Sequence, residues 1–180
     1  MKLIFLDIDG VLNTKEDSLR RVCLYNPGLR RFGKTQINPN LTGICDLYGQ
    51  LFSPSAVGWL AHIIRETDAK IVISSTWRYS GLSEMQQMWK YRSLPGEVIA
   101  ITEDSYRATT GHEDTKYEDW RGAEIDLYLR KNPCEGYCII DDDRDMLPSQ
   151  MTHFVHCDAE FGIREKEAKL AIVMLNRKTC

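Results

Sequence analysis

The chain has 180 residues, of which 43% are hydrophobic and 27% are charged, and its formal net charge is −3 at pH 7. This length is enough for one domain with a substantial core and an insertion. With this slightly negative net charge, the protein as a whole does not attract nucleic acid or anionic membranes. A polyanion would therefore need a local basic patch in order to bind. No apolar run approaches the roughly 20 residues of a membrane span, and we expect no membrane partner.

The six cysteines are scattered and contain no Cys-x-x-Cys pair, which favours reduced thiols and a cytoplasmic location. Acidic residues interrupt the N-terminal apolar run, so we expect no signal peptide. The chain contains five residues of types that bind zinc in its C-terminal half: Cys134, Cys138, His153, His156 and Cys157. Their spacing matches no common zinc signature, so buried or incidental thiols are the favoured interpretation.

The first predicted element is a buried strand over residues 3–6, Leu-Ile-Phe-Leu. An uninterrupted apolar run is typical of a strand in a parallel sheet, which is covered on both faces. Two carboxylates, Asp7 and Asp9, follow where the strand ends, and Gly10 permits a sharp turn close to a ligand. Because sites in open α/β sheets form at the carboxyl ends of strands, this segment is a candidate site.

Further strands alternate with helices along the chain. The strands are predicted at residues 70–74, 97–102, 136–140 and 153–157. The helices are predicted at residues 54–67, 83–91, 121–131 and 165–177. Ser53 and Pro54 supply an N-cap and a first-turn proline for the first of these helices. The alternation predicts an α/β fold with a doubly wound parallel sheet, in a single domain over residues 1–180.

Two polar segments do not fit the alternation. Residues 13–51 are broken by prolines and glycines and are too long for an ordinary connection, so we predict a flap-like insert after the first strand. This insert carries a basic group made of Arg20, Arg21, Arg30, Arg31 and Lys34. Residues 103–119 form the second polar segment, which we also expect to lie above the site.

A second acidic cluster, Asp141, Asp142 and Asp143, follows the strand at residues 136–140. If the two strands that end in acids are parallel neighbours, these carboxylates meet those after the first strand at one edge of the sheet. Like charges packed so closely repel one another unless a cation neutralises them. Oxygen ligands favour a hard ion, so the sequence predicts Mg²⁺. The alternative is that these acids cap helices and face water.

The strand at residues 70–74 ends in a hydroxyl cluster that begins with Ser74 and Ser75. Hydroxyls and backbone N–H groups at such a turn can hold phosphoryl oxygens, although helix capping alone also explains them. A fixed cation should face the transferring group. Arg121, at the start of the helix before the acidic strand, is the first candidate, and Lys116 is the second.

Together these motifs resemble those of the haloacid dehalogenase (HAD) superfamily of phosphotransferases. Phe5-Leu6-Asp7-Ile8-Asp9-Gly10 matches the first motif, Ile71-Val72-Ile73-Ser74 the second, and Ile139-Ile140-Asp141-Asp142 the fourth. Arg121 or Lys116 would serve as the third. A narrower resemblance, carried by LDIDGVLN, IVISSTWR, RGAEI and IIDDDRDM, is to the HAD domains of RNA-repair proteins and to polynucleotide kinase–phosphatases. The resemblance implies a HAD-like, Rossmannoid sheet.

The resemblance also implies separate roles for the first two acids. Asp7 would be the nucleophile that forms an aspartyl-phosphate, and Asp9 would protonate the leaving oxygen and then deprotonate water. The presence of Asp9 favours a phosphatase over a dehalogenase, because a halide leaving group needs no proton. Val11 stands where many HAD phosphatases have threonine.

The same resemblance implies a ligand set for the metal. Mg²⁺ would bind Asp7, the backbone carbonyl of Asp9, and Asp141 or Asp142. The hydroxyl cluster and the cation would hold the phosphoryl oxygens in line. The resemblance leaves open whether Asp141 or Asp142 binds the ion directly.

The length of the chain leaves no room for the large cap domain that encloses small substrates in many HAD phosphatases. An open site suits a nucleic-acid end or a nucleotide, and Arg30, Arg31 and Arg78 are candidate substrate contacts. Three alternatives remain: a phosphatase for a sugar phosphate or phosphoprotein, a metal-dependent nuclease, and a catalytically silent phosphate-binding module. The sequence does not predict the oligomeric state.

Overall fold

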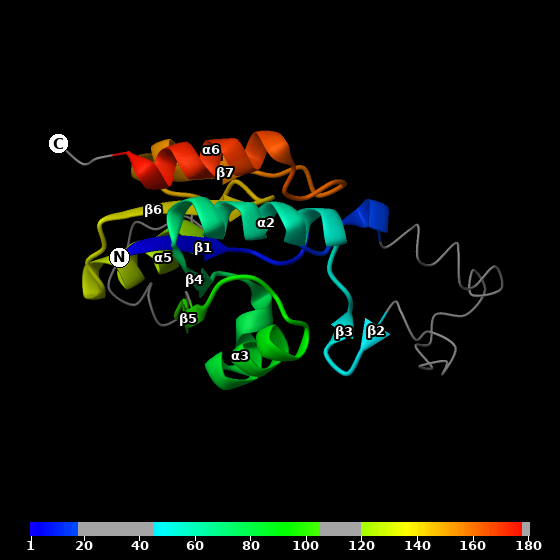
Figure 1. The fold of residues 1–180 in the computed structure, drawn as a ribbon. Helices are drawn as coiled ribbons and strands as arrows, with labels where there is room; N and C mark the ends of the chain where they lie inside the picture. Colours follow the sequence, from blue (N-terminus) through cyan, green and yellow to red (C-terminus); the bar gives the residue numbers. More distant parts are fainter. Residues whose placement is uncertain (18–44, 105–119, 178–180) are drawn as a thin grey trace.

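Five parallel strands form the centre of the structure, in the spatial order β5-β4-β1-β6-β7 (Figure 1). The computed structural model describes residues 1–17, 45–104 and 120–177. The strands are β1 (Lys2–Leu6), β4 (Lys70–Ile73), β5 (Val98–Ile101), β6 (Gly136–Asp141) and β7 (Phe154–His156). Each predicted strand is present, with ends within one residue of those expected. The predicted parallel α/β sheet is therefore confirmed.

The helices that pack against this sheet are α2 (Pro54–Thr67), α3 (Leu82–Tyr91), α5 (Trp120–Lys131) and α6 (Glu165–Asn176). The Ser53 hydroxyl accepts a hydrogen bond from the Ala56 N–H at 3.4 Å, which is the N-cap predicted for α2. Two 3₁₀ helices, η3 (Thr76–Ser80) and η6 (Pro148–His153), were not predicted. None of the helices in the described ranges is long and apolar enough to cross a membrane.

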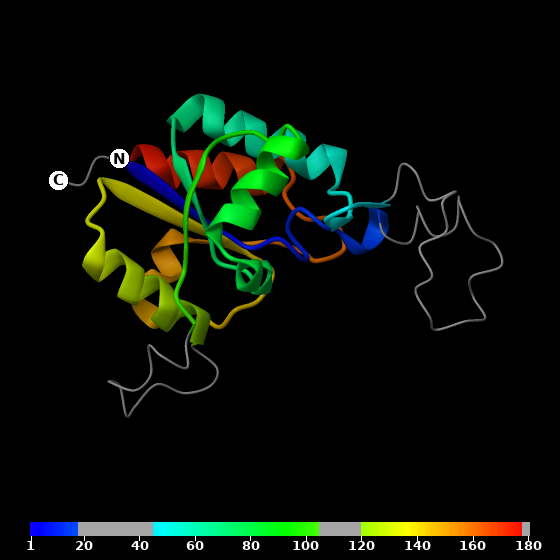
Figure 2. The same cartoon turned by 90° about the horizontal axis from the view of Figure 1, so that it is seen from below.

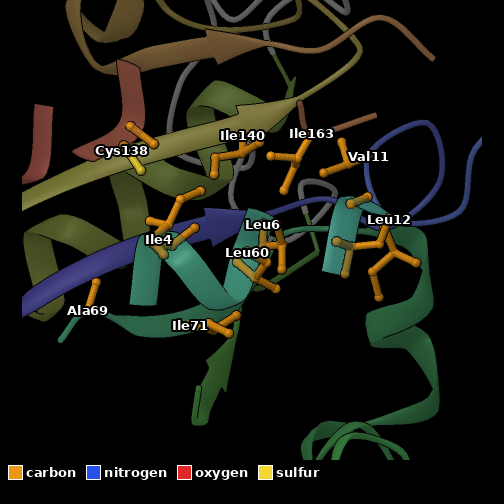
Figure 3. Packing of buried hydrophobic residues seen from close by; sticks show 14 of the residues in the cluster. Ile4, Leu6, Val11, Leu12, Leu60, Ala69, Ile71, Cys138, Ile140 and Ile163 are labelled. Carbon is orange, nitrogen blue, oxygen red and sulfur yellow. The ribbon is translucent and has the colours of Figure 1, made fainter. Parts of the chain in front are cut away.

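The apolar side chains of β1 alternate between the two faces of the sheet, and each face has its own core. Ile4 and Leu6 pack on the face covered by α2 and α6, whereas Leu3 and Phe5 pack on the face covered by α5. Figures 1 and 2 show α2 and α6 side by side on one face and α5 on the other. Figure 3 shows Ile4 and Leu6 close to Leu60 of α2. Burial on both faces explains the uninterrupted apolar sequence of β1.

The C-terminal end of the predicted insert forms a small hairpin of β2 (Cys45–Asp46) and β3 (Gly49–Gln50). Arg92, directly after α3, donates hydrogen bonds to both carboxylate oxygens of Asp46 at 2.7 and 2.8 Å. The guanidinium also lies 4.5 Å from the centre of the Phe52 ring, so these contacts tie the hairpin to α3. Most of the insert lies outside the described residues, and its role as a flap within a single domain stays a prediction.

Candidate active site

The residues expected at the site come from three neighbouring strands that end at the same level. Leu6, at the end of β1, pairs with Ile73 of β4 on one side and with Ile140 of β6 on the other. The Asp7 N–H donates to the Ile140 carbonyl at 3.0 Å, and the Ser74 N–H donates to the Leu6 carbonyl at 2.9 Å. Backbone pairing therefore fixes Asp7 between the hydroxyl-bearing end of β4 and the acidic end of β6.

The chain turns sharply after Asp7. The Ile8 carbonyl accepts hydrogen bonds from three following N–H groups, at 2.8, 2.8 and 3.3 Å. Gly10 has a φ of +75°, and a Cβ at this position would lie 2.3 Å from the carboxyl carbon of Asp142. Glycine is needed here because the backbone is left-handed and because two loops approach each other closely.

Three carboxylates converge at this edge of the sheet. One oxygen from each of Asp7, Asp141 and Asp142 lies within 4.8 Å of the others, and no other such cluster of His, Cys, Asp or Glu occurs among the described residues. The five residues considered for zinc therefore do not gather into a site. Asp141 is only 1% exposed, and within the described chain its Oδ2 has no hydrogen-bond partner. A buried carboxylate oxygen in this state is costly unless a cation neutralises it, and an all-oxygen donor set suits Mg²⁺.

Arg121, in the first turn of α5, reaches the same strand ends. Its Nη1 lies 3.4 Å from Asp7 Oδ1, and its Nε lies 3.7 Å from Asp141 Oδ2. Nη1 also donates a hydrogen bond to the Ser74 carbonyl. Asp145 holds the start of the helix by accepting a hydrogen bond from the Arg121 N–H at 3.4 Å. The helix before the acidic strand thus brings a guanidinium to the first acid of the chain.

The electrostatics of the cluster favour binding of a cation. Burial raises the pKa of Asp7 to about 6, and the charge of Arg121 only partly opposes this effect. Burial and the neighbouring Asp7 charge raise the pKa of Asp141 well above its usual range. Burial also raises the pKa of Asp142. Burial disfavours the charge of Arg121 as well, but Asp141 and Asp7 raise its pKa. A single guanidinium does not offset three carboxylates, which is the situation that a divalent ion relieves.

Ser74 and Ser75 lie beside Asp7, as predicted. Ser75 is 0% exposed, and its hydroxyl donates a hydrogen bond to the Asp7 carboxylate. This hydrogen bond lowers the pKa of Asp7, but burial raises that pKa by more. Ser74 is 1% exposed, and its hydroxyl oxygen has no hydrogen-bond partner in the described part of the chain. A hydroxyl in this state next to Asp7 can bind an oxygen of a phosphoryl group.

A family model described as the HAD domain in Swiss Army Knife RNA repair proteins matches residues 3–168, which include all of these strand ends. The chain belongs to this HAD family. The resemblance inferred from the motifs is therefore confirmed, and membership supports a phosphatase of the HAD type. No curated protein and no solved structure matches the chain.

The second acid of the first HAD motif, Asp9, does not join the three-carboxylate cluster. Both of its oxygens instead accept hydrogen bonds, from Trp77 Nε1 at 2.9 Å and from Asn13 Nδ2 at 2.8 Å. Neither donor was predicted, although both lie in segments that carry the narrower resemblance, Asn13 at the end of LDIDGVLN and Trp77 in IVISSTWR. Those segments show the residue types but not which side chains meet.

The acids open into a cavity of about 370 Å³. Its lining includes Thr76 of the predicted hydroxyl cluster, and also residues that the sequence did not single out: Asn13, Thr14, Lys15 and Ala159. Lys15 is exposed, and its charge partly opposes the effect of burial on the pKa of Asp142. Lys15 was missed because it lies in the segment assigned to the insert, only a few residues after the first motif.

Arg78, predicted to contact the substrate, is directed into the protein. It donates hydrogen bonds to Glu124 of α5 at 2.7 Å and to the Ser75 carbonyl at 3.3 Å. Arg78 does not line the cavity in front of Asp7 and instead borders a separate cavity of about 390 Å³. This geometry favours a link between η3 and α5 over a contact with substrate.

Three of the predicted site residues lie outside the described residues: Arg30, Arg31 and Lys116. The rest of the basic group in the insert, Arg20, Arg21 and Lys34, lies outside them as well. Their roles stay predictions, as does that of Arg121 as the cation of the third HAD motif. The structure places the Arg121 guanidinium 3.4 Å from Asp7 Oδ1.

Proposed function

We propose that this HAD domain is a Mg²⁺-dependent phosphatase that removes a terminal phosphate from a nucleic-acid end through an aspartyl-phosphate. The main support is the position of Asp7, which lies in one cluster with Asp141 and Asp142 and 3.4 Å from the Arg121 guanidinium. A nucleophile, metal ligands and a phosphate-binding cation are what phosphoryl transfer requires, because positioning and electrostatic stabilisation dominate this chemistry.

In the first step, a carboxylate oxygen of Asp7 attacks the phosphorus in line with the leaving oxygen. The bond from Asp7 to phosphorus forms while the bond to the leaving oxygen breaks, and Asp9 gives its proton to that oxygen. Arg121 and the Ser74 hydroxyl hold the other phosphoryl oxygens. Asp7, Asp141 and Asp142 would hold Mg²⁺, which would supply positive charge so that a carboxylate and a phosphate can approach each other.

In the second step, water attacks the aspartyl-phosphate. Asp9, now a carboxylate, takes a proton from this water, and Asp7 is released together with inorganic phosphate. The two acids have different surroundings. Asp7 is 6% exposed and lies in the acidic cluster, whereas Asp9 is exposed and lines the cavity outside that cluster.

A nucleic-acid end is the substrate class that the family description supports, since it names RNA repair proteins. The net charge of −3 gives no general attraction for a polyanion, so local cations must supply it. Lys15 and Arg121 line the cavity and serve the terminal phosphate in this proposal. We assign contacts with the rest of the nucleic acid to Arg30 and Arg31 of the insert.

A substrate panel tests this proposal. Phosphate release is measured with Mg²⁺ for RNA and DNA oligonucleotides phosphorylated at the 5′ or 3′ end, for mononucleotides, for a sugar phosphate and for a phosphopeptide. We expect the highest kcat/KM with an oligonucleotide. Activity confined to sugar phosphates or to the phosphopeptide would exclude the nucleic-acid substrate, and cleavage of internal phosphodiester bonds would indicate a nuclease.

Asp7→Asn tests the nucleophile itself. The amide keeps the size of the side chain but cannot attack phosphorus, so we expect loss of phosphate release and of beryllofluoride binding. Asp126→Asn is the matched control, because Asp126 pairs with Arg130 on the surface of α5, away from the cluster. If Asp7→Asn keeps the activity of Asp126→Asn on every substrate, the aspartyl-phosphate mechanism is wrong.

A further inference from the structure

Asp9 is held from both sides by neutral donors. Trp77 Nε1 donates to Asp9 Oδ2 at 2.9 Å, across 68 positions of sequence, and Asn13 Nδ2 donates to Asp9 Oδ1 at 2.8 Å. An exposed aspartate is normally able to occupy several rotamers. With one donor on each oxygen, only one orientation of the carboxyl group satisfies both hydrogen bonds.

The Trp77 donor is itself fixed in place. Its backbone N–H donates to Ser75 Oγ at 3.4 Å, and its ring packs edge-on against Phe52 with ring centres 5.6 Å apart. The Arg92 guanidinium lies 5.9 Å from the centre of the indole. Because η3 begins directly after Ser74 and Ser75, the turn that adjoins Asp7 also carries the donor that orients Asp9.

We propose that Trp77 is a positioning residue that places the Asp9 carboxyl group against the leaving oxygen of the substrate. This inference rests on the proposed phosphatase function. In the step concerned, the bond from Asp7 to phosphorus forms as the bond to the leaving oxygen breaks. The electron pair of the broken bond stays on that oxygen, which receives the proton from Asp9. Trp77 sets the distance between this proton and the phosphoryl group held beside Ser74, and a small displacement of a reacting group is costly in rate.

The role of Trp77 should depend on the leaving group. An alkoxide leaves poorly and needs a proton, whereas p-nitrophenolate leaves without one. Loss of the Trp77 hydrogen bond should therefore slow hydrolysis of benzyl phosphate and spare hydrolysis of p-nitrophenyl phosphate. The parameter to compare is kcat/KM, because it reports the free energy between free enzyme and the transition state for departure of the leaving group.

Trp77→Phe removes the indole N–H and keeps an aromatic ring against Phe52. We expect kcat/KM for benzyl phosphate to fall about 10-fold, as part of the roughly 10²–10⁴-fold that a general acid contributes, and kcat/KM for p-nitrophenyl phosphate to stay within about twofold. Trp89→Phe is the matched control, because Trp89 Nε1 donates to the Pro95 carbonyl at 2.9 Å rather than to Asp9. The ratio of the two substrates should not change in Trp89→Phe.

Two further variants separate this inference from the function on which it rests. Asn13→Ala removes the other donor to Asp9 and should show the same selective loss of kcat/KM for benzyl phosphate. It takes the place of Trp77→Phe if that variant does not fold. Asp9→Asn should show the largest selective loss. If Asp9→Asn affects both substrates equally, the acid role of Asp9 fails and the inference fails with it. If Asp9→Asn discriminates between the substrates and neither donor variant does, only the inference is wrong.

Discussion

Arg78 and Glu124 form an ion pair inside the protein, with 2.7 Å between Nη2 and Oε1 and side chains that are 7% and 3% exposed. Arg78 lies on η3, which follows Ser74 and Ser75, and Glu124 lies on α5, one turn beyond Arg121. The pair therefore connects the turn beside Asp7 to the helix that carries Arg121. Its integrity should matter for both stability and the geometry of the site.

Glu124→Gln should destabilise the protein by roughly 3 kcal/mol, because it leaves the buried Arg78 guanidinium without a compensating charge. Urea unfolding followed by circular dichroism measures this change. The double variant Arg78→Met, Glu124→Leu removes both charges and should recover most of the lost stability. If the double variant is as unstable as Glu124→Gln, the uncompensated charge is not the cause.

A surface pair provides the control for this comparison. On α2, Arg65 Nε lies 3.3 Å from Glu66 Oε1, and the two side chains are 68% and 45% exposed. Exposed pairs are screened by solvent and contribute little. Glu66→Gln should therefore leave the urea midpoint almost unchanged, whereas Glu124→Gln should lower it clearly.

The convergence of Asp7 and Asp141 was predictable from the sequence, and the Arg78–Glu124 pair was not. Each of the two aspartates follows an apolar run, and parallel strands bring their carboxyl ends to one edge of a sheet. Arg78 and Glu124 lie 46 positions apart, in segments whose periodicity says nothing about their partners. Arginine and glutamate are mostly exposed residues, so the sequence pattern favoured a substrate contact for Arg78 over a place in the interior.

The donors to Asp9 were missed for a related reason. The sequence shows the bulk of the Trp77 indole but not the direction of its N–H group. That direction is set by the backbone of η3 together with the edge-on packing of the Trp77 ring against Phe52, a contact between distant segments. Local patterns therefore identified the acids, and only the fold identified what orients them.

Gly10→Ala should abolish phosphate release and weaken Mg²⁺ binding by about 10-fold or more. The substitution strains a backbone with φ +75° and places a Cβ 2.3 Å from the Asp142 carboxyl carbon, so this carboxylate must move. Isothermal titration with Mg²⁺ measures the effect. Gly58→Ala is the control, since Gly58 lies in α2, where an added Cβ would meet nothing within 4 Å, and it should stabilise the helix by about 0.5–1 kcal/mol.

Without Mg²⁺, Asp7→Asn should stabilise the protein at pH 7 while it removes activity. The pKa of Asp7 is raised to about 6, so the folded state binds this proton more tightly than the unfolded state, in which the pKa is about 3.9. The ionised group thus destabilises the fold above pH 6, and this effect disappears as the pH falls towards about 4. We expect a gain on the order of 1–3 kcal/mol in thermal unfolding with EDTA at pH 7. Equal stability of the two proteins at pH 7 would contradict the burial of this charge.

Binding of Mg²⁺ should offset part of the destabilisation that the ionised Asp7 causes in the unsubstituted protein. An ion that binds only the folded state stabilises it by about 2.7 kcal/mol at 100 times its Kd. Asp141→Asn removes a carboxylate of the cluster, and we expect the Mg²⁺-dependent rise in melting temperature to be lost or much reduced. Asp126→Asn, which changes a surface acid on α5, should show the full rise. A full rise in Asp141→Asn would place the ion elsewhere.

The hairpin contact should show the opposite dependence on pH. Hydrogen bonds from Arg92, at 2.7 and 2.8 Å, hold the pKa of Asp46 below its usual range against the effect of burial. A depressed pKa contributes stability above the unfolded pKa of about 3.9, and this contribution is lost as the pH falls through the folded pKa. Asp46→Asn should therefore be less stable than the unsubstituted protein by about 1–3 kcal/mol at pH 7, and the difference should shrink below about pH 4.

Urea unfolding at pH 7, 5 and 3 tests this prediction for Asp46→Asn. Asp7→Asn serves as a comparison, because its effect on stability has the opposite sign. If Asp46→Asn shows no deficit at pH 7, packing of Arg92 on Phe52, rather than the Asp46 carboxylate, holds the hairpin to α3.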